Sequence, residues 1–150
     1  MNKKGFTLVE LLAVIAILAI LVIIALPNVL SMFNDSKKNS FMTEVREVFS
    51  TAQKQFMADA VTGAANGLTY SNNLTTACDP ATGKLEMQGR AVDGGSLSYS
   101  ITLNSDGTVA SMNVSDGTFS YSGTPTDASE IISDSIKTGD TYTAATCTAN

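Results

Sequence analysis

The chain is 150 residues long, which is enough for about one domain. Apolar residues make up 44% of it and charged residues only 15%, against about 25% charged in an ordinary soluble domain, and the formal net charge is −5. There is no His, which excludes Ser-His-Asp and Cys-His catalysis, a His general base and His metal ligation.

The first element in chain order is one long apolar segment. Every residue from Leu11 to Leu26 is Leu, Ile, Val or Ala, and no charged residue occurs from Leu11 through Asn34. A bilayer core about 30 Å thick is crossed by about 20 helical residues, so this segment is long enough to span a membrane. A secretory signal peptide has a shorter apolar core of about 7–15 residues and ends at a small-residue cleavage site, so an ordinary membrane anchor is the stronger alternative.

Two residues near the start of this segment fit neither alternative. Glu10 lies directly before the apolar run, where a carboxylate costs free energy unless it has a partner or a role. Gly5 follows a leader that contains Lys3 and Lys4, and a glycine leaves the backbone open to the close approach that a protease needs. A plain anchor explains neither feature.

Residues 5–12, with the sequence Gly-Phe-Thr-Leu-Val-Glu-Leu-Leu, resemble the class III signal of type IV pilins and of the related pseudopilins. The resemblance covers residues 1–33 closely, through the leader lysines, the apolar run and Pro27. It implies that prepilin peptidase cuts between Gly5 and Phe6 and that the new amino group of Phe6 is methylated. It also implies that Glu10 pairs with the Phe6 amine of a neighbouring subunit and fixes the subunit register.

The helix is expected to continue well beyond the apolar segment. Between Phe6 and Thr62 there is no Gly and no Pro except Pro27, and Gly63 is the first stop signal. A helix over that range is roughly 85 Å long. Because proline removes one backbone hydrogen bond and clashes with the preceding turn, we expect a kink or local opening near Pro27, and the resemblance implies an unwound segment before it in filaments.

The second half of this helix is amphipathic. Apolar residues recur at the spacing of one helix face, namely Phe41, Val45, Val48, Phe49, Ala52 and Phe56. The pattern predicts that this face packs against a globular core.

From residue 64 onwards Ser and Thr dominate the composition. Residues 64–95 indicate a long loop with short strands around Leu85–Met87. Alternation of apolar and polar residues then predicts a three-stranded antiparallel meander. Its apolar face is expected to hold Leu97, Tyr99, Ile101, Leu103, Ala110, Met112, Val114, Phe119 and Tyr121.

The last segment of the chain shows a capping pattern. Residues 127–130, with Asp127 and Glu130 at their ends, resemble the capping box of a short helix. Its apolar side is expected to hold Ile131, Ile132 and Ile136, with Gly139 as its end, and residues 141–150 are expected to be extended.

The charges of the head are mostly negative. Residues 55–150 hold three Lys or Arg against ten Asp or Glu, a net charge of −7, which disfavours nucleic-acid binding by the head alone. No segment has the ligand spacing of an EF-hand, so we expect turn chemistry, with no metal and no cofactor, at Asp93, Asp106, Asp116 and Asp140. A calcium site at the head is the remaining alternative.

Cys78 and Cys147 are the only cysteines. The resemblance places the head outside the cytoplasm, where a disulfide is the default, and many type IV pilins close a C-terminal region in this way. Such a bond would contribute about 4 kcal/mol in the chain-entropy model. Free thiols and a metal pair are the weaker alternatives, because two cysteines so far apart match no zinc motif.

Together these features predict an α+β chain with a leader peptide at 1–5, a transmembrane and assembly helix at 6–33, and a head at 34–150. The head divides into an amphipathic helix half at 34–62 and a region at 63–150 with loop, sheet and disulfide. Lys3 and Lys4 lie at one end of the apolar helix and Lys37 and Lys38 at the other, so the positive-inside rule alone leaves the orientation nearly even. The resemblance implies that Lys3 and Lys4 are on the cytoplasmic side.

The resemblance implies a non-enzymatic structural subunit of a type IV pilus, acting in adhesion, motility and surface interaction. It implies a precursor in the inner membrane and a helical homo-oligomer outside the cell. The implied partners are prepilin peptidase, an assembly platform and an ATPase. The alternative is a pseudopilin of a type II secretion system or of a competence pilus. A membrane-anchored enzyme is disfavoured, because the sequence contains no Gly-x-Ser-x-Gly, Ser-x-x-Lys or phosphate-loop motif.

Overall fold

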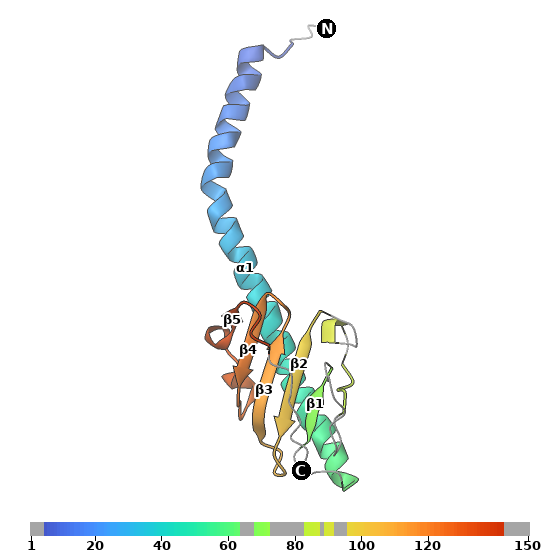
Figure 1. Cartoon of the computed structure of the whole chain (residues 1–150). Coiled ribbons are helices and arrows are strands. Elements are labelled where there is room, and N and C mark those ends of the chain that lie inside the picture. The colour runs from blue at the N-terminus through green and yellow to red at the C-terminus, as the bar shows by residue number, and fades with distance from the viewer. Residues whose placement is uncertain (1–4, 64–67, 73–82, 88, 92–95, 143–150) are drawn as a thin grey trace. The chain divides into compact units, whose positions relative to one another are not determined.

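The computed structural model describes residues 5–63, 68–72, 83–87, 89–91 and 96–142. It has an α+β arrangement with one long helix and a five-stranded sheet (Figure 1). The elements are α1 (Leu8–Val61), β1 (Thr69–Ser71), η1 (Gly89–Ala91), β2 (Ser98–Leu103), β3 (Val109–Ser115), β4 (Phe119–Gly123), η2 (Ala128–Glu130), η3 (Ser133–Ser135) and β5 (Lys137–Thr138). The chain divides into two compact units, residues 1–37 and 38–150.

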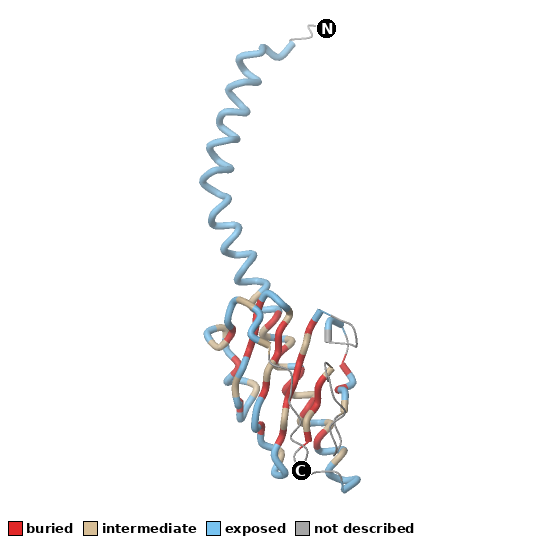
Figure 2. The backbone as a smooth tube through the Cα atoms, in the orientation of Figure 1, coloured by how far each residue is buried: buried red, intermediate tan, exposed pale blue. Residues whose placement is uncertain are grey.

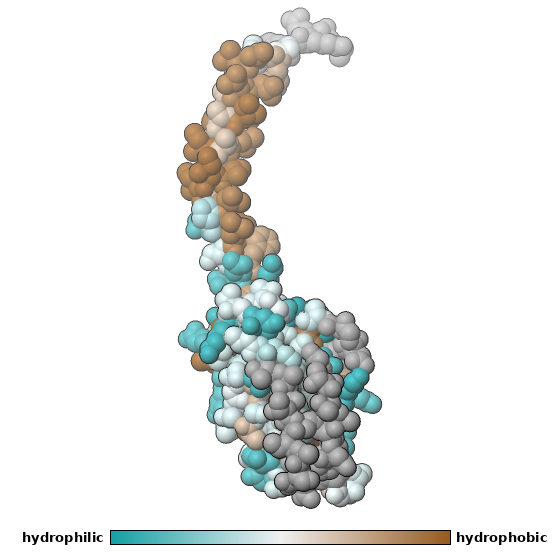
Figure 3. Space-filling view, in the orientation of Figure 1, coloured by the Kyte–Doolittle hydropathy of each residue, from teal (hydrophilic) through white to brown (hydrophobic). Residues whose placement is uncertain are grey.

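The first unit contains the apolar half of α1. Its large apolar side chains from Leu8 to Leu30 are 43–76% exposed. This part of the helix is exposed along its length (Figure 2), and the surface in view is mostly hydrophobic (Figure 3). The helix is unbroken at Pro27, so the single chain has no local opening there, and the alternative expectation of a kink stays a prediction. The loss of one hydrogen bond at proline does not interrupt so long a helix, and the unwinding implied for filaments stays a prediction.

In the second unit, residues 38–61 of α1 pack on the sheet. All six residues of the predicted apolar face are buried, as expected: Phe41, Val45, Val48, Phe49, Ala52 and Phe56. The rings of Phe41 and Phe119 lie 6.0 Å apart between centroids. The helix ends at Val61, one residue before the predicted end. Gly63 follows as the expected stop, because its φ of +87° suits glycine and its N–H donates to the Ala60 carbonyl at 3.2 Å.

The sheet is an antiparallel meander in the order β1-β2-β3-β4-β5. The three predicted strands form its centre, with Tyr99 opposite Val114 and Val114 opposite Tyr121. Two further strands were not expected, because β1 has three residues and β5 two, too few to show an alternating pattern. Conversely, Leu85–Met87 form no strand, although Leu85 and Met87 are buried in the core.

One predicted core position on β3 is wrong. Ala110 is exposed, and the residue that turns inward beside the β2–β3 turn is Val109. The register shifts between Thr102 and Leu103, so that Leu103 pairs with Val109. Because side chains alternate with period two, this irregularity moves the inward positions by one residue.

The segment after β4 is two separate turns of 3-10 helix, not one short helix. Asp127 does cap the first turn by accepting a hydrogen bond from the Ser129 N–H. Ile131 and Ile136 are buried as expected, but Ile132 is 48% exposed. The chain returns to an extended backbone at Ile131 and Ile132, so these isoleucines do not share one helix face.

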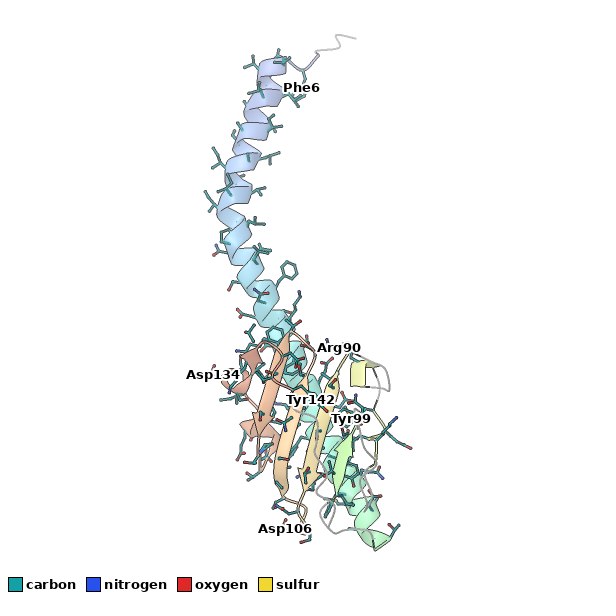
Figure 4. All side chains as sticks on the ribbon, viewed as in Figure 1. Phe6, Arg90, Tyr99, Asp106, Asp134 and Tyr142 are labelled. Atoms are coloured by element: carbon teal, nitrogen blue, oxygen red, sulfur yellow. The ribbon has the colours of Figure 1, made fainter. Side chains whose placement is uncertain are left out.

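At the C-terminal end the described residues stop at Tyr142. Its hydroxyl donates to the Tyr99 carbonyl at 3.3 Å (Figure 4). Most of the stretch expected to be extended, residues 143–150, lies outside the described residues, and so do both Cys78 and Cys147. The disulfide therefore stays a prediction.

Candidate processing and assembly site

The N-terminal segment presents Gly5, Phe6 and Thr7 ahead of the first helical residue, Leu8. The Phe6 side chain is 83% exposed (Figure 4). A Cβ atom built on Gly5 would meet nothing within 4 Å, and its φ lies outside the left-handed region. Nothing in the described part of the fold therefore requires glycine at residue 5.

Glu10 forms a reciprocal cap with Thr7 at the start of α1. The Glu10 carboxylate accepts from the Thr7 N–H at 2.9 Å and from the Thr7 hydroxyl at 2.8 Å. The Thr7 Oγ1 atom in turn accepts from the Glu10 N–H at 3.3 Å. The pair satisfies two N–H groups that have no partner inside the helix. The sequence-based prediction did not assign this role to Thr7, although Thr-x-x-Glu is the signature of a capping box.

This cap leaves the Glu10 carboxylate able to receive a cation. A carboxylate offers about four lone-pair sites, and the cap uses one of its two oxygens, Oε2. In the uncut chain the nitrogen of Phe6 is a neutral peptide N–H. It becomes an ammonium group only when the bond after Gly5 is broken, so the positive partner expected for Glu10 is created by processing.

The remaining predicted site residues do not gather around this carboxylate. Pro27 lies seventeen residues along the same helix, about 25 Å from Glu10. The predicted pairing of Glu10 with Phe6 concerns two copies of the chain, and the structure holds one. Those roles stay predictions.

Two of the four aspartates that the sequence assigned to turns, Asp106 and Asp116, serve turns in the structure. Asp106 accepts from the Thr108 N–H and hydroxyl at 2.9 and 2.6 Å, and Asp116 accepts from the Thr118 and Phe119 N–H groups at 2.8 and 2.7 Å. Gly107 completes the first turn with a φ of +82°, and a Cβ there would lie 3.1 Å from the Phe56 ring. Within the described residues no group of three His, Cys, Asp or Glu could hold a metal; Asp93 lies outside them.

Two arginines tie the helix to the rest of the head. Arg90, on η1, donates to Glu44 of α1 and to Asp116 in the β3–β4 turn (Figure 4). Arg46 donates twice to the Ile131 carbonyl, at 3.0 and 2.8 Å. The Tyr70 hydroxyl donates to Asp59 at 2.6 Å, and burial raises the pKa of Tyr70. These contacts hold the head together and form no reactive cluster.

The turn carboxylates predict that the head loses stability in acid. Hydrogen bonds from the Tyr142 N–H and then Ser115 lower the pKa of Asp140, and bonds from the Thr108 side chain and N–H lower that of Asp106. A lowered pKa stabilises the fold above the unfolded value of about 3.9, and this contribution disappears as pH falls through the folded pKa. The urea concentration at the unfolding midpoint of the full chain should therefore decrease as the pH is lowered from about 5 to about 2.

The measurement is urea unfolding followed by Tyr fluorescence in detergent across this range. Asp140→Asn should flatten the acid decline, whereas Asp134→Asn should leave it unchanged because no hydrogen bond from another described residue to the Asp134 carboxylate is seen. An equal slope for Asp140→Asn and the unchanged chain would contradict the prediction.

By length and composition, α1 contains a stretch that can cross a membrane, and none of that stretch is buried inside the protein. The family model described as the prokaryotic N-terminal methylation motif matches residues 1–26. Residues 1–26 carry the class III signal of type IV pilins. No curated protein and no solved structure matches the chain.

The class III signal supports a precursor of the type IV pilin-like or pseudopilin kind. It is typical of a structural subunit rather than an enzyme. It implies processing by prepilin peptidase and assembly into filaments, and together with the exposed apolar half of α1 it is consistent with a membrane-anchored precursor.

Proposed function

We propose that this chain is the structural subunit of an extracellular type IV pilus, polymerising through its apolar N-terminal helix. The observation that carries the proposal is the unpartnered apolar surface of residues 8–30, joined to a head whose own core is packed. So large an exposed apolar surface marks a site of membrane or protein contact. Lipid covers it in the precursor, and helices of other copies cover it in the filament.

The subunit is proposed to exist first as a membrane-bound precursor and then in the assembled filament. The precursor sits in the inner membrane with leader residues 1–5 in the cytoplasm, residues 6–33 in the bilayer and the head, 34–150, outside. Prepilin peptidase cuts after Gly5, Phe6 is methylated, and an assembly platform with a cytoplasmic ATPase extracts the subunit. The assembled heads form the outer surface, where a Cys78–Cys147 disulfide would hold the C-terminus and where adhesion would take place.

Glu10 is proposed to select the position of each incoming subunit. In a medium of low dielectric constant, a carboxylate and an ammonium group offset each other's desolvation only when they meet. The Phe6 ammonium exists only in the processed chain, so an ion pair between Glu10 and Phe6 would allow only cut subunits to join the filament. The cap by Thr7 holds the carboxylate close to the helix start, where a neighbour's N-terminus can reach it.

A pseudopilin of a type II secretion system or a competence pilus is the second candidate. The matched segment is shared by pilins and pseudopilins, so residues 1–26 fit both. A head that ends in a predicted Cys78–Cys147 disulfide is more typical of pilins, and this supports the pilus over the second candidate.

Mass spectrometry of filaments sheared from the cell surface tests the proposal. The expected result is that the dominant species is a chain that begins at N-methylated Phe6. Deletion of this subunit should remove long surface filaments seen by electron microscopy. Surface filaments that persist after deletion, together with loss of protein secretion or DNA uptake, would favour the second candidate instead.

A further inference from the structure

The outward face of α1 in the second unit carries two opposite charges at a repeat of seven residues. Glu47 and Lys54 are both exposed, on the side of the helix away from the buried residues Val45, Phe49 and Ala52. Seven residues are close to two turns, so the two side chains lie on one line along the helix, about 10.5 Å apart. Among the described residues neither has an ion-pair partner.

Two parallel copies of this helix repel each other when these faces meet without an axial shift. At zero axial shift Glu47 would face Glu47 and Lys54 would face Lys54, and like charges placed side by side oppose association. A shift of seven residues, about 10.5 Å, instead brings Glu47 of one copy opposite Lys54 of the other. The charges are then complementary, and the short side chains of Thr43 and Ala58 beside them permit close approach.

We propose that this face is a docking surface for a second copy of the chain, with Glu47 of one subunit paired to Lys54 of its neighbour across an axial shift of about seven residues. The inference rests on the proposed filament. It adds a second register contact within the heads to the one proposed at Glu10. Phe6 and Glu10 are four residues apart, whereas Glu47 and Lys54 are seven apart, so the two pairings require different axial shifts between copies. They would therefore join each subunit to two different neighbours.

Charge reversal in the full chain tests the pairing. Glu47→Lys and Lys54→Glu should each lower the yield of sheared filaments roughly tenfold or more, because each places like charges together. The double variant should restore the yield. Asp134→Lys is the matched control, a charge reversal at an exposed residue of η3 instead of α1 (Figure 4), and should assemble like the unchanged chain.

Cysteine cross-linking separates failure of the register from failure of the filament. A chain with both Glu47→Cys and Lys54→Cys should give a ladder of covalent oligomers in intact filaments when treated with a short thiol-reactive cross-linker. Either single variant should give none beyond the background of the unchanged chain. Filaments that form without the ladder, or a cross-linked dimer from Glu47→Cys alone, would overturn the register. Absence of filaments from the unchanged chain would overturn the proposed function as well.

Discussion

Replacing Glu10 by leucine is expected to abolish filament assembly while the chain still enters the membrane. Breaking a buried ion pair by removing one partner costs about 3–5 kcal/mol, which lowers subunit association by roughly a hundredfold or more. Insertion should be unaffected or improved, because a carboxylate at the edge of the apolar segment opposes it. Filament yield after shearing and membrane content of the subunit are the two measurements.

The variant Glu10→Gln separates the charge from the cap. Glutamine serves in a capping box as well as glutamate does, so this substitution keeps the contact with Thr7 and removes the negative charge. If the ion pair drives assembly, the glutamine variant should be as defective as the leucine variant. Normal assembly of the glutamine variant would show that the helix cap, not the charge, is what Glu10 supplies.

The second large effect is expected at Phe41, where α1 meets the sheet. Phe41 is fully buried and its ring contacts that of Phe119. Its replacement by alanine removes this contact and leaves a cavity, at a cost of about 3–5 kcal/mol. Because single domains are stable by only about 5–15 kcal/mol, this is a large part of the free energy of unfolding of the head.

Phe33→Ala is the matched control for this substitution. Phe33 belongs to the same helix and is 60% exposed, so its loss should leave the head's unfolding midpoint unchanged. Urea unfolding of the full chain in detergent, followed by the fluorescence of its tyrosines, measures both variants. Equal midpoints for the two variants would contradict the packing described for Phe41.

Residues with strong local periodicity were predictable from the sequence. The stripe from Phe41 to Phe56 and the alternation through β2 identify most of the core on their own, because burial selects apolar residues at the period of each element. The signal at Gly5, Phe6 and Glu10 is equally visible. In that segment the spacing of a few residues carries the information, and no tertiary contact is needed to read it.

Features that depend on contacts between distant segments were not predictable. The short strands β1 and β5 exist because neighbouring strands offer them hydrogen bonds, at Ile101 and Phe119 among others. The bulge beside Leu103 moves the inward position from Ala110 to Val109. The two 3-10 turns that stand in place of one predicted helix leave Ile132 exposed and bury Ile131 and Ile136.

The sequence by itself thus determined the processing signal, the apolar helix and the face of that helix that the head covers, because each is written in local spacing. Only the tertiary structure decided the full extent of the sheet, which depends on pairing between segments far apart in the chain. It also showed that the Glu10 carboxylate is already bonded to Thr7 and that Glu47 and Lys54, on the outward face, form no ion pair with another described residue. The contacts within one copy must be known before one can say which charged side chains are available to pair with another copy.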